Sequence, residues 1–384
     1  MSFSWEKIGS ISTPGAAASL RFTLSYNNSG KLSYFNGSEY RDIGFFHSGN
    51  TFNSSIEYSQ STPGWVGALP TSGIFYLING AGSSYDGLYI KKFIPEQVYT
   101  IVKRINSGTG SYFESNVYGF DSGDEDFISY SYHYEGSGGT GSLNTDYFAF
   151  GPKILPFYVG APRMAAVEPG FSGKCCISRN GQFAAVEGLL AGQKTIKVYT
   201  SQNGYPGNVN PIVLQIGGNI QIPGTENISE VKINNAGTRL VAYTFSNIYT
   251  YELISGSWEE RPALASPASN SGTGISLCSA GNILVTRGNI VANSYLWDTN
   301  SNSWQLVDQT ALIAPLSYVG RRIDMSGDAK YMAVDVWPTT NSTAIEIYSR
   351  IDNIPLYKGA YAESIYYGSS VPNSIYYGST KLWP

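Results

Sequence analysis

The sequence predicts an all-β fold: a β-propeller of about seven four-stranded blades with a short C-terminal aromatic tail. Three observations favour this fold class. Short apolar runs of period two are common, whereas few windows show the i, i+3, i+4 apolar spacing of an amphipathic helix. Turns rich in Gly, Asn and Ser separate these runs. A group of four runs also recurs, and internal periods of roughly 40 to 50 residues are typical of propellers.

The clearest repeat unit spans residues 174–217. It contains four short apolar runs, at residues 175–177, 183–186, 195–199 and 212–216. The turn after the first run carries Asn180-Gly181, and Asn-Gly between two β-forming runs is a strong hairpin signal, because a type I′ turn needs positive φ at both central residues. Four short strands joined by turns predict an antiparallel meander, the form of one propeller blade.

Three further units follow within residues 231–357 and repeat the same order of runs and turns. All four units are expected to carry a glycine in the first hairpin. These glycines are Gly181, Gly237, Gly281 and Gly327, separated by 56, 44 and 46 residues. The last unit offers residues 354–357 as a fourth strand.

The first 160 residues contain three weaker units, at 19–69, 73–105 and 111–160. Their expected strands are 20–25, 31–35, 55–58 and 65–69 in the first unit, 74–78, 87–93 and 97–104 in the second, and 117–120, 127–134, 146–150 and 154–159 in the third. Six or eight blades remain open, since this region can be divided differently. The segment EGSGGTGSLN at 135–144 is expected to be an exposed, mobile loop.

The N-terminal segment matches the fourth run of later units. Ser4-Trp5-Glu6 has the same pattern as the segments around Trp258 and Trp304. We therefore expect residues 3–10 to form the outer strand of the last blade and to close the ring, with residues 354–357 as the competing candidate.

Residues 1–358 are assigned to the propeller, and residues 359–384 to a C-terminal tail. The hexapeptide SIYYGS occurs at 364–369 and again at 374–379, and the two copies could pair as a hairpin. An aromatic, nearly uncharged end is poorly suited to free solvent. It either packs on the wall of the propeller or docks on another subunit, and the second interpretation is preferred. The expected docking residues are Tyr366, Tyr367, Tyr376, Tyr377 and Trp383.

Composition excludes several classes of function. The formal net charge is −4 and no basic block is present, which argues against nucleic-acid binding. No apolar run approaches the ~18 residues of a membrane span. The start MSFSWEKIGS lacks the basic and apolar segments of a secretory signal, so synthesis and folding in a cytoplasm are expected.

Few residues suit catalysis or metal binding. The two histidines, His47 and His133, lie in no zinc motif, and His133 is expected to pack in an aromatic strand. Cys175, Cys176 and Cys278 are expected to be buried apolar side chains rather than a disulfide or redox pair, with Cys175 and Cys176 on opposite faces of one strand. No cofactor is expected.

Acidic residues are the remaining candidates. The turn DSGDED at residues 121–126 could share a calcium ion, although a solvated Asp-rich turn is preferred and no metal site is predicted. Glycoside hydrolysis needs two carboxylates in a cleft. Glu187, Asp324 and Asp335 lie on or beside expected strands, but no motif selects them.

Two resemblances follow from these residues. The segments SWEKIGS, ISRNGQFAAV and IKVYT resemble repeats of propellers related to the WD40 and FG-GAP types. The Gly-His and repeated Trp-Asp signatures of WD40 and the calcium loops of FG-GAP are absent, so no calcium role is carried over. The ending SIYYGSTKLWP is similar to C-terminal segments of structural proteins in tailed bacteriophages, especially marine and cyanobacterial ones, and implies a virion component.

We therefore expect a non-catalytic virion structural or attachment protein of a tail, fibre or baseplate. Its propeller would present binding surfaces to a host-surface glycan or protein, or to neighbouring subunits. Its tail would attach it to other virion proteins, and it would be oligomeric in the particle. The alternatives are a capsid-decorating or vertex protein, and a glycan depolymerase.

Overall fold

The computed structural model describes the backbone of residues 2–14, 21–24, 31–35, 39–44, 53–59, 65–68, 75–80, 88–94, 97–103, 113–122, 127–138, 141–152, 165–167, 171, 173–202, 212–266, 274–288, 290–312, 322–339, 342–353, 376–377 and 380–381. Side chains are described mainly in residues 2–11 and in the ranges between 171 and 352.

Every regular element in these ranges is a β-strand, which confirms the all-β prediction. The strands form seven four-stranded antiparallel sheets and one two-stranded sheet. No helix that could span a membrane occurs among the described residues.

The first three sheets come from the N-terminal half of the chain. They are β2 (Arg21–Leu24), β3 (Lys31–Phe35), β4 (Glu39–Gly44) and β5 (Asn53–Ser59); β6 (Trp65–Ala68), β7 (Phe75–Gly80), β8 (Leu88–Ile94) and β9 (Gln97–Lys103); and β10 (Phe113–Ser122), β11 (Phe127–Gly138), β12 (Gly141–Pro152) and β13 (Ala165–Val167).

The next three sheets follow the clear sequence repeats. They are β14 (Cys175–Ile177), β15 (Phe183–Leu190), β16 (Gln193–Gln202) and β17 (Ile212–Gln221); β18 (Ile228–Ile233), β19 (Arg239–Thr244), β20 (Asn247–Ile254) and β21 (Ser257–Ala265); and β22 (Ile275–Leu277), β23 (Ile283–Arg287), β24 (Val291–Asp298) and β25 (Ser303–Ala311). The seventh sheet joins β26 (Ile323–Met325), β27 (Tyr331–Thr339) and β28 (Ser342–Asn353) to β1 (Ser2–Pro14).

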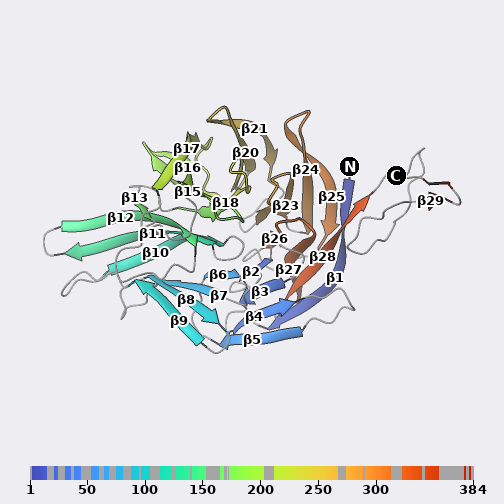
Figure 1. The fold of residues 1–384 in the computed structure, drawn as a ribbon, viewed down its shortest axis with the longest axis horizontal. Helices are drawn as coiled ribbons and strands as arrows, with labels where there is room; N and C mark the ends of the chain where they lie inside the picture. The colour runs from blue at the N-terminus through green and yellow to red at the C-terminus, as the bar shows by residue number, and fades with distance from the viewer. Residues whose placement is uncertain are drawn as a thin grey trace.

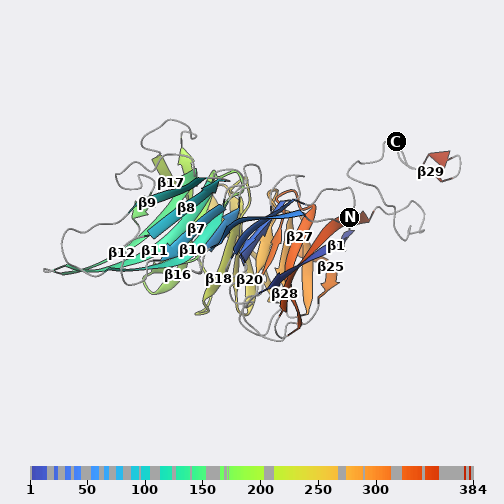
Figure 2. The same ribbon diagram turned by 90° about the horizontal axis from the view of Figure 1, so that it is seen from below.

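The first strands of successive sheets form a closed ring. Each contacts the first strand of the next sheet, in the order β2, β6, β10, β14, β18, β22, β26 and back to β2. Figure 1 looks onto this ring, with the sheets following one another from blue through green to orange, and Figure 2 shows it from the side. A ring of four-stranded meanders is the architecture of a β-propeller.

The N-terminal strand closes the ring, as the sequence predicted. β1 pairs with β28 from Ser2 opposite Asn353 to Pro14 opposite Ser342, with one bulge between Lys7 and Gly9. The last sheet is therefore built from both ends of the chain, and β1 provides its outer strand. The competing segment 354–357 lies outside the described residues.

The first hairpin of each clear repeat is present, but its turn is not type I′. Only the last residue of each turn has positive φ, at 71° for Gly181, 66° for Gly237 and 76° for Gly281. The amide of Gly181 donates to the carbonyl of Ser178, so a four-residue turn ends in one left-handed residue. This is the longer hairpin loop with a bulge. Gly327 lies in the turn of the fourth hairpin, as expected, but Ala329 takes the left-handed position there, with φ 55°.

The N-terminal half departs from the expected boundaries. Residues 65–68 were predicted as a fourth strand, but they form β6, the first strand of the next sheet, because the unpredicted β4 takes a place in the first sheet. In the third sheet the fourth strand is β13, while residues 154–159 lie outside the described part. A polar β4 lacks the apolar alternation that makes a strand visible in sequence.

The expected mobile loop at 135–144 is instead largely a hairpin extension. β11 continues to Gly138 and β12 starts at Gly141, with Glu135 opposite Asn144. Backbone pairing satisfies the N–H and C=O groups of these residues without needing large apolar side chains, so a Gly/Ser-rich segment can still continue a ladder.

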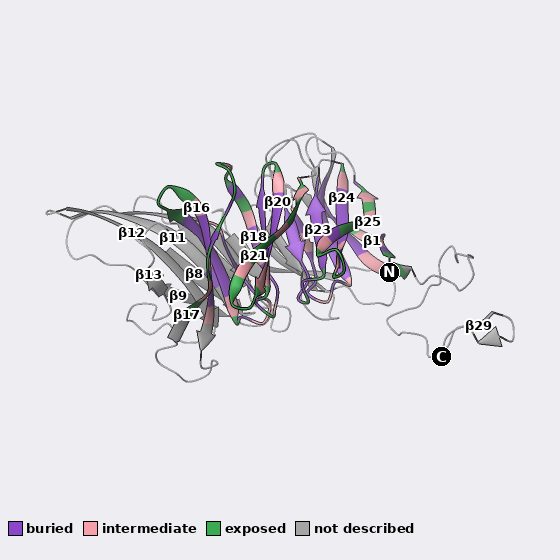
Figure 3. Ribbon diagram, turned by 90° about the horizontal axis from the view of Figure 1, so that it is seen from above, coloured by how far each residue is buried: buried purple, intermediate pink, exposed green. Residues whose placement is uncertain are grey.

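The described core lies between neighbouring sheets. One buried cluster joins the sixth and seventh sheets and includes Phe3, Trp5, Val285 and Met332. A second joins the fourth and fifth sheets. In Figure 3, β23 and β24 are largely purple, whereas the outer strand β21 is mostly pink and green. Packing of sheet on sheet round the ring holds the inner strands, and thus their polar side chains, in place.

Candidate functional site

Hydrogen bonds join the inner hairpin turns of successive sheets. The amide of Asn235 donates to the carbonyl of Ser279 at 2.9 Å, and the amide of Ser279 donates to the carbonyl of Gly327 at 2.8 Å. Asn180 completes the series, because its side-chain amide donates to the carbonyl of Asn235 at 3.0 Å. The turns after β14, β18, β22 and β26 are thereby fixed relative to one another.

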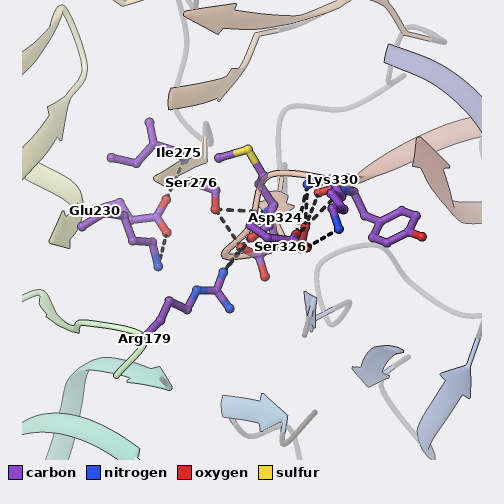
Figure 4. Close-up of polar contacts among 11 residues, drawn as sticks. Arg179, Glu230, Ile275, Ser276, Asp324, Ser326 and Lys330 are labelled. Carbon is purple, nitrogen blue, oxygen red and sulfur yellow. Dashed lines mark hydrogen bonds and ion pairs between the residues drawn. The ribbon is translucent and has the colours of Figure 1, made fainter. Parts of the chain in front are cut away.

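Arg179 lies in the first of these turns and reaches the seventh sheet. Its Nη2 donates to Oδ1 of Asp324 at 3.2 Å and to the carbonyl of Met325 at 2.8 Å. β14 and β26 are separated by two inner strands on one side of the ring and by three on the other. The side chain therefore extends across the middle of the ring, as Figure 4 shows. Both side chains of this ion pair are only 14% exposed.

Ser276 of β22 holds the Asp324 carboxylate in position. The Ser276 hydroxyl donates to Oδ1 of Asp324 at 2.8 Å, and the same hydroxyl accepts the amide of Met325 at 3.1 Å. The Met325 amide also donates to Oδ1 of Asp324 at 2.9 Å. The carboxylate thus has three donors from three elements, which fix its position.

Glu230 makes a comparable link one sheet earlier. Its Oε2 accepts the amide of Ile275 at 2.9 Å, and its Oε1 lies 3.3 Å from Nζ of Lys232. The carboxylate therefore joins the first strands of the fifth and sixth sheets (Figure 4). It serves the ring as a hydrogen-bond acceptor and counter-ion.

A buried ion pair lies between the sixth and seventh sheets. The Arg287 and Asp335 side chains are 0% and 1% exposed, with Nε of Arg287 3.4 Å from Oδ1 of Asp335. The amide of Arg322 also donates to that oxygen, at 2.8 Å. Burial raises the pKa of the Asp335 carboxyl, and the Arg287 guanidinium opposes this rise. Burial likewise lowers the pKa of Arg322. Each charge of a buried pair depends on the other, because loss of one would leave an uncompensated charge in the core.

The three acids noted in the sequence do not converge on one site. Glu187 accepts the amide of Lys174 at 3.0 Å and Nζ of Lys194 at 3.2 Å, within the fourth sheet. Asp324 binds Arg179, and Asp335 binds Arg287. Each carboxylate has its own cation and a separate place in the fold. These three carboxylates are therefore held apart by different partners and do not form the acid and base pair of a glycosidase.

Other candidates are placed only in part. Within the described side chains, no group of three or more His, Cys, Asp or Glu residues could hold a metal ion. Of the acidic turn, 121–122 end β10 and 123–126 lie outside the described part, as does His47. His133 pairs with Asn116 and Asp146 in β11.

All three cysteines are buried, as predicted. Cys175 packs in one apolar cluster and Cys176 in another, which confirms that the two point to opposite faces of the strand.

The tail shows one short hairpin. Tyr376 and Tyr377 form β29 (Tyr376–Tyr377), which pairs with β30 (Thr380–Lys381). Tyr376 and Tyr377 of the second hexapeptide therefore pair with Lys381 and Thr380. The expected pairing of the two hexapeptides across Val371-Pro372-Asn373 falls on residues outside the described part of the chain. The other proposed docking residues, Tyr366, Tyr367 and Trp383, lie outside the described residues.

Sequence reasoning missed Arg179, Ser276 and Glu230 as members of one polar centre. Only one signal could have suggested it. At the turn position of Arg179, the corresponding residues of the next three repeats are short, namely Asn235, Ser279 and Gly327. A long cation at a position otherwise held by short residues indicates a special role.

The closed ring of four-stranded sheets places this chain in the class of β-propellers. Side chains of the chain itself form a polar centre in the ring. Comparison with solved structures supports the class. The β-propeller domain of Cps50 (Swd1) from Myceliophteria thermophila aligns over 90% of this chain and 99% of its own, with a TM-score of 0.53 and 10% sequence identity. At that identity the likeness shows the fold alone.

Other solved structures align less closely. A protein from Lactobacillus plantarum covers 75% of this chain and 84% of its own length, with 12% identity and a TM-score of 0.46. A protein from Bacteroides uniformis, provisionally named a 6-phosphogluconolactonase, covers 77% and 86%, with 11% identity and a TM-score of 0.45. No family model and no curated protein matches the chain.

Proposed function

We propose that this chain is a non-catalytic binding scaffold, a structural or attachment component of a virion. One observation carries the non-catalytic part. The acidic side chains described at the ring centre and between the sheets are bound to cations of the chain itself, as in Arg179 with Asp324 and Arg287 with Asp335. A carboxylate held by a guanidinium and by backbone amides is engaged by the chain itself and is not presented to a substrate.

The virion part of the proposal depends on the C-terminal sequence. Two SIYYGS segments and the ending KLWP place four tyrosines and one tryptophan in 21 residues with one charged side chain, Lys381, and one acid, Glu363, just before them. Tyr and Trp supply much of the energy of protein interfaces. We assign Tyr366, Tyr367, Tyr376, Tyr377 and Trp383 to attachment to another virion protein.

Deletion of residues 361–384 tests this assignment. The truncated protein should keep its far-ultraviolet circular dichroism spectrum and its unfolding transition, but it should no longer be incorporated into particles. A matched full-length control replaces Leu189 and Phe245, two large apolar side chains that are 55% and 46% exposed on the propeller, with serine. Normal incorporation of the truncated protein would contradict the attachment role.

A second assay tests the non-catalytic part separately. Incubation of the full-length protein with host-surface polysaccharide should release no new reducing ends, whereas binding to the same polysaccharide or to host cells is the expected interaction. Release of reducing ends that is lost on Asp324→Asn or Glu187→Gln substitution would identify a depolymerase and would overturn the proposal.

A further inference from the structure

Arg179 fills an acceptor site that other sheets build. The acceptors are Oδ1 of Asp324 and the carbonyl of Met325, both in β26, and Arg179 enters from the turn after β14. The two residues are 145 positions apart in the sequence. The guanidinium thus comes from a turn of another sheet and reaches the acceptors through a long side chain.

The acceptor site is organised without Arg179. Ser276 and the Met325 amide hold the Asp324 carboxylate by hydrogen bonds of 2.8 and 2.9 Å. The Met325 carbonyl is fixed by β26, whose residues Ile323 and Met325 are buried at 5% and 0% exposure. Loss of the Arg179 side chain would therefore leave the carboxylate and the carbonyl oxygen in place and facing the space that the guanidinium had filled.

The turn that contains Arg179 does not need a cation at this position to adopt its geometry. In the equivalent turns, Ser279 supplies only backbone groups to the bonds between turns, Asn235 adds a short side-chain oxygen that accepts the amide of Asn180, and Gly327 has no side chain. The turn after β14 instead uses Asn180 for its link to Asn235. The guanidinium is therefore dispensable for turn geometry and is available for a role at the ring centre.

We propose that Asp324, Ser276 and the Met325 carbonyl form a guanidinium-binding site at the ring centre, which the chain occupies with its own Arg179 and which accepts an external guanidinium when Arg179 is removed or displaced. One guanidinium nitrogen, Nη2, donates to both the carboxylate and the neighbouring carbonyl. A guanidinium is more weakly hydrated than the ammonium of lysine and so is more easily taken from water into such a site. The ligand class is a guanidine, either small and free or at the end of an arginine side chain. This site is independent of the assignment to a virion.

The test uses the full-length Arg179→Ala variant and methylguanidinium chloride at millimolar concentration, with equal sodium chloride as the reference. A ligand this small should bind with a dissociation constant of roughly 1 mM. At ten times that concentration, the melting temperature of the variant should rise by about 1–3 °C in a saturable way. The wild-type protein, whose site is filled, should not respond, and neither should the Arg179→Ala/Asp324→Asn double variant.

Absence of a saturable rise in the Arg179→Ala variant, or an equal rise in the double variant, would overturn the proposal. If Arg179→Ala does not fold alone, its refolding yield with and without methylguanidinium becomes the measurement, and rescue is expected only while Asp324 is present. The peptide Gly-Arg-Gly distinguishes the two sources of ligand. A response to this peptide shows that the site accepts an arginine from a partner chain, and a response to methylguanidinium alone restricts it to small cations.

Discussion

The indole of Trp5 donates a hydrogen bond of 2.8 Å to the hydroxyl of Ser294, which lies 289 positions later in the sequence. Trp304 makes the same bond one sheet earlier, to the hydroxyl of Thr250 at 2.8 Å. Trp258 donates instead to the carbonyl of Ile216 at 3.1 Å. Outer-strand tryptophans thus bind the preceding sheet, and Trp5 does so from the N-terminal strand that completes the last sheet.

Replacement of Trp5 by Phe should destabilise the protein. The variant keeps an aromatic ring but leaves the Ser294 hydroxyl, which is fully buried, without its donor. The free energy of unfolding should fall by about 1–3 kcal/mol. Urea unfolding of Trp5→Phe, Ser294→Ala and the double variant measures this change. The double variant should lose less than the sum of the single variants, and strict additivity would show that the bond has no energetic role.

Replacement of Gly237 by Ala should be more costly than replacement of Gly256. Both have left-handed backbones, with φ 66° and 84°, so both variants should lose about 1–2 kcal/mol from backbone strain. A Cβ on Gly237 would also lie 2.4 Å from the Phe183 ring, whereas one on Gly256 would meet nothing within 4 Å. The overlap should add about 1–3 kcal/mol. Urea unfolding of the two variants provides the comparison, and equal losses would refute the contact.

The Arg287–Asp335 pair should show strong coupling. Arg287→Met leaves a buried carboxylate, and Asp335→Leu leaves a buried guanidinium, so each should lose about 3–5 kcal/mol of stability. The double variant removes both charges of the pair and should recover at least about 2 kcal/mol of the summed losses. A double-mutant cycle by chemical denaturation measures this coupling. A coupling energy near zero would mean that the two charges do not stabilise one another.

Tyr348 should make stability depend on alkaline pH. Burial raises the pKa of its phenol above the ordinary value of 10.0, and its hydrogen bond to Glu346 adds to the rise. Because the folded pKa exceeds the unfolded pKa, this contribution is complete below pH 10.0 and is lost as pH rises toward the folded pKa.

Unfolding measured between pH 9 and about pH 11 should therefore show a smaller loss of stability for Tyr348→Phe than for the wild type. For each pH unit in this range, the unfolding constant of the wild type should rise by up to about ten times more than that of Tyr348→Phe. Identical slopes for wild type and Tyr348→Phe would show that Tyr348 ionises equally in both states.

Much of the fold was predictable from local patterns. The strands between 174 and 353 alternate in hydrophobicity and end at Gly-containing turns, so their order and hairpins could be inferred. Ser4-Trp5-Glu6 also identified β1 as the outer strand of the last sheet. The strands of the first half were less visible, since β4 is a polar segment and β11 and β12 continue through glycine-rich sequence.

The sequence by itself determined that this chain forms antiparallel meanders, because side-chain alternation and turn residues act within a few positions. Only the tertiary structure decided which polar side chains meet. Arg179 and Asp324 contact one another because seven sheets curve into one ring and bring β14 opposite β26. That curvature depends on how every sheet packs on its neighbours, and no local pattern near either residue records it.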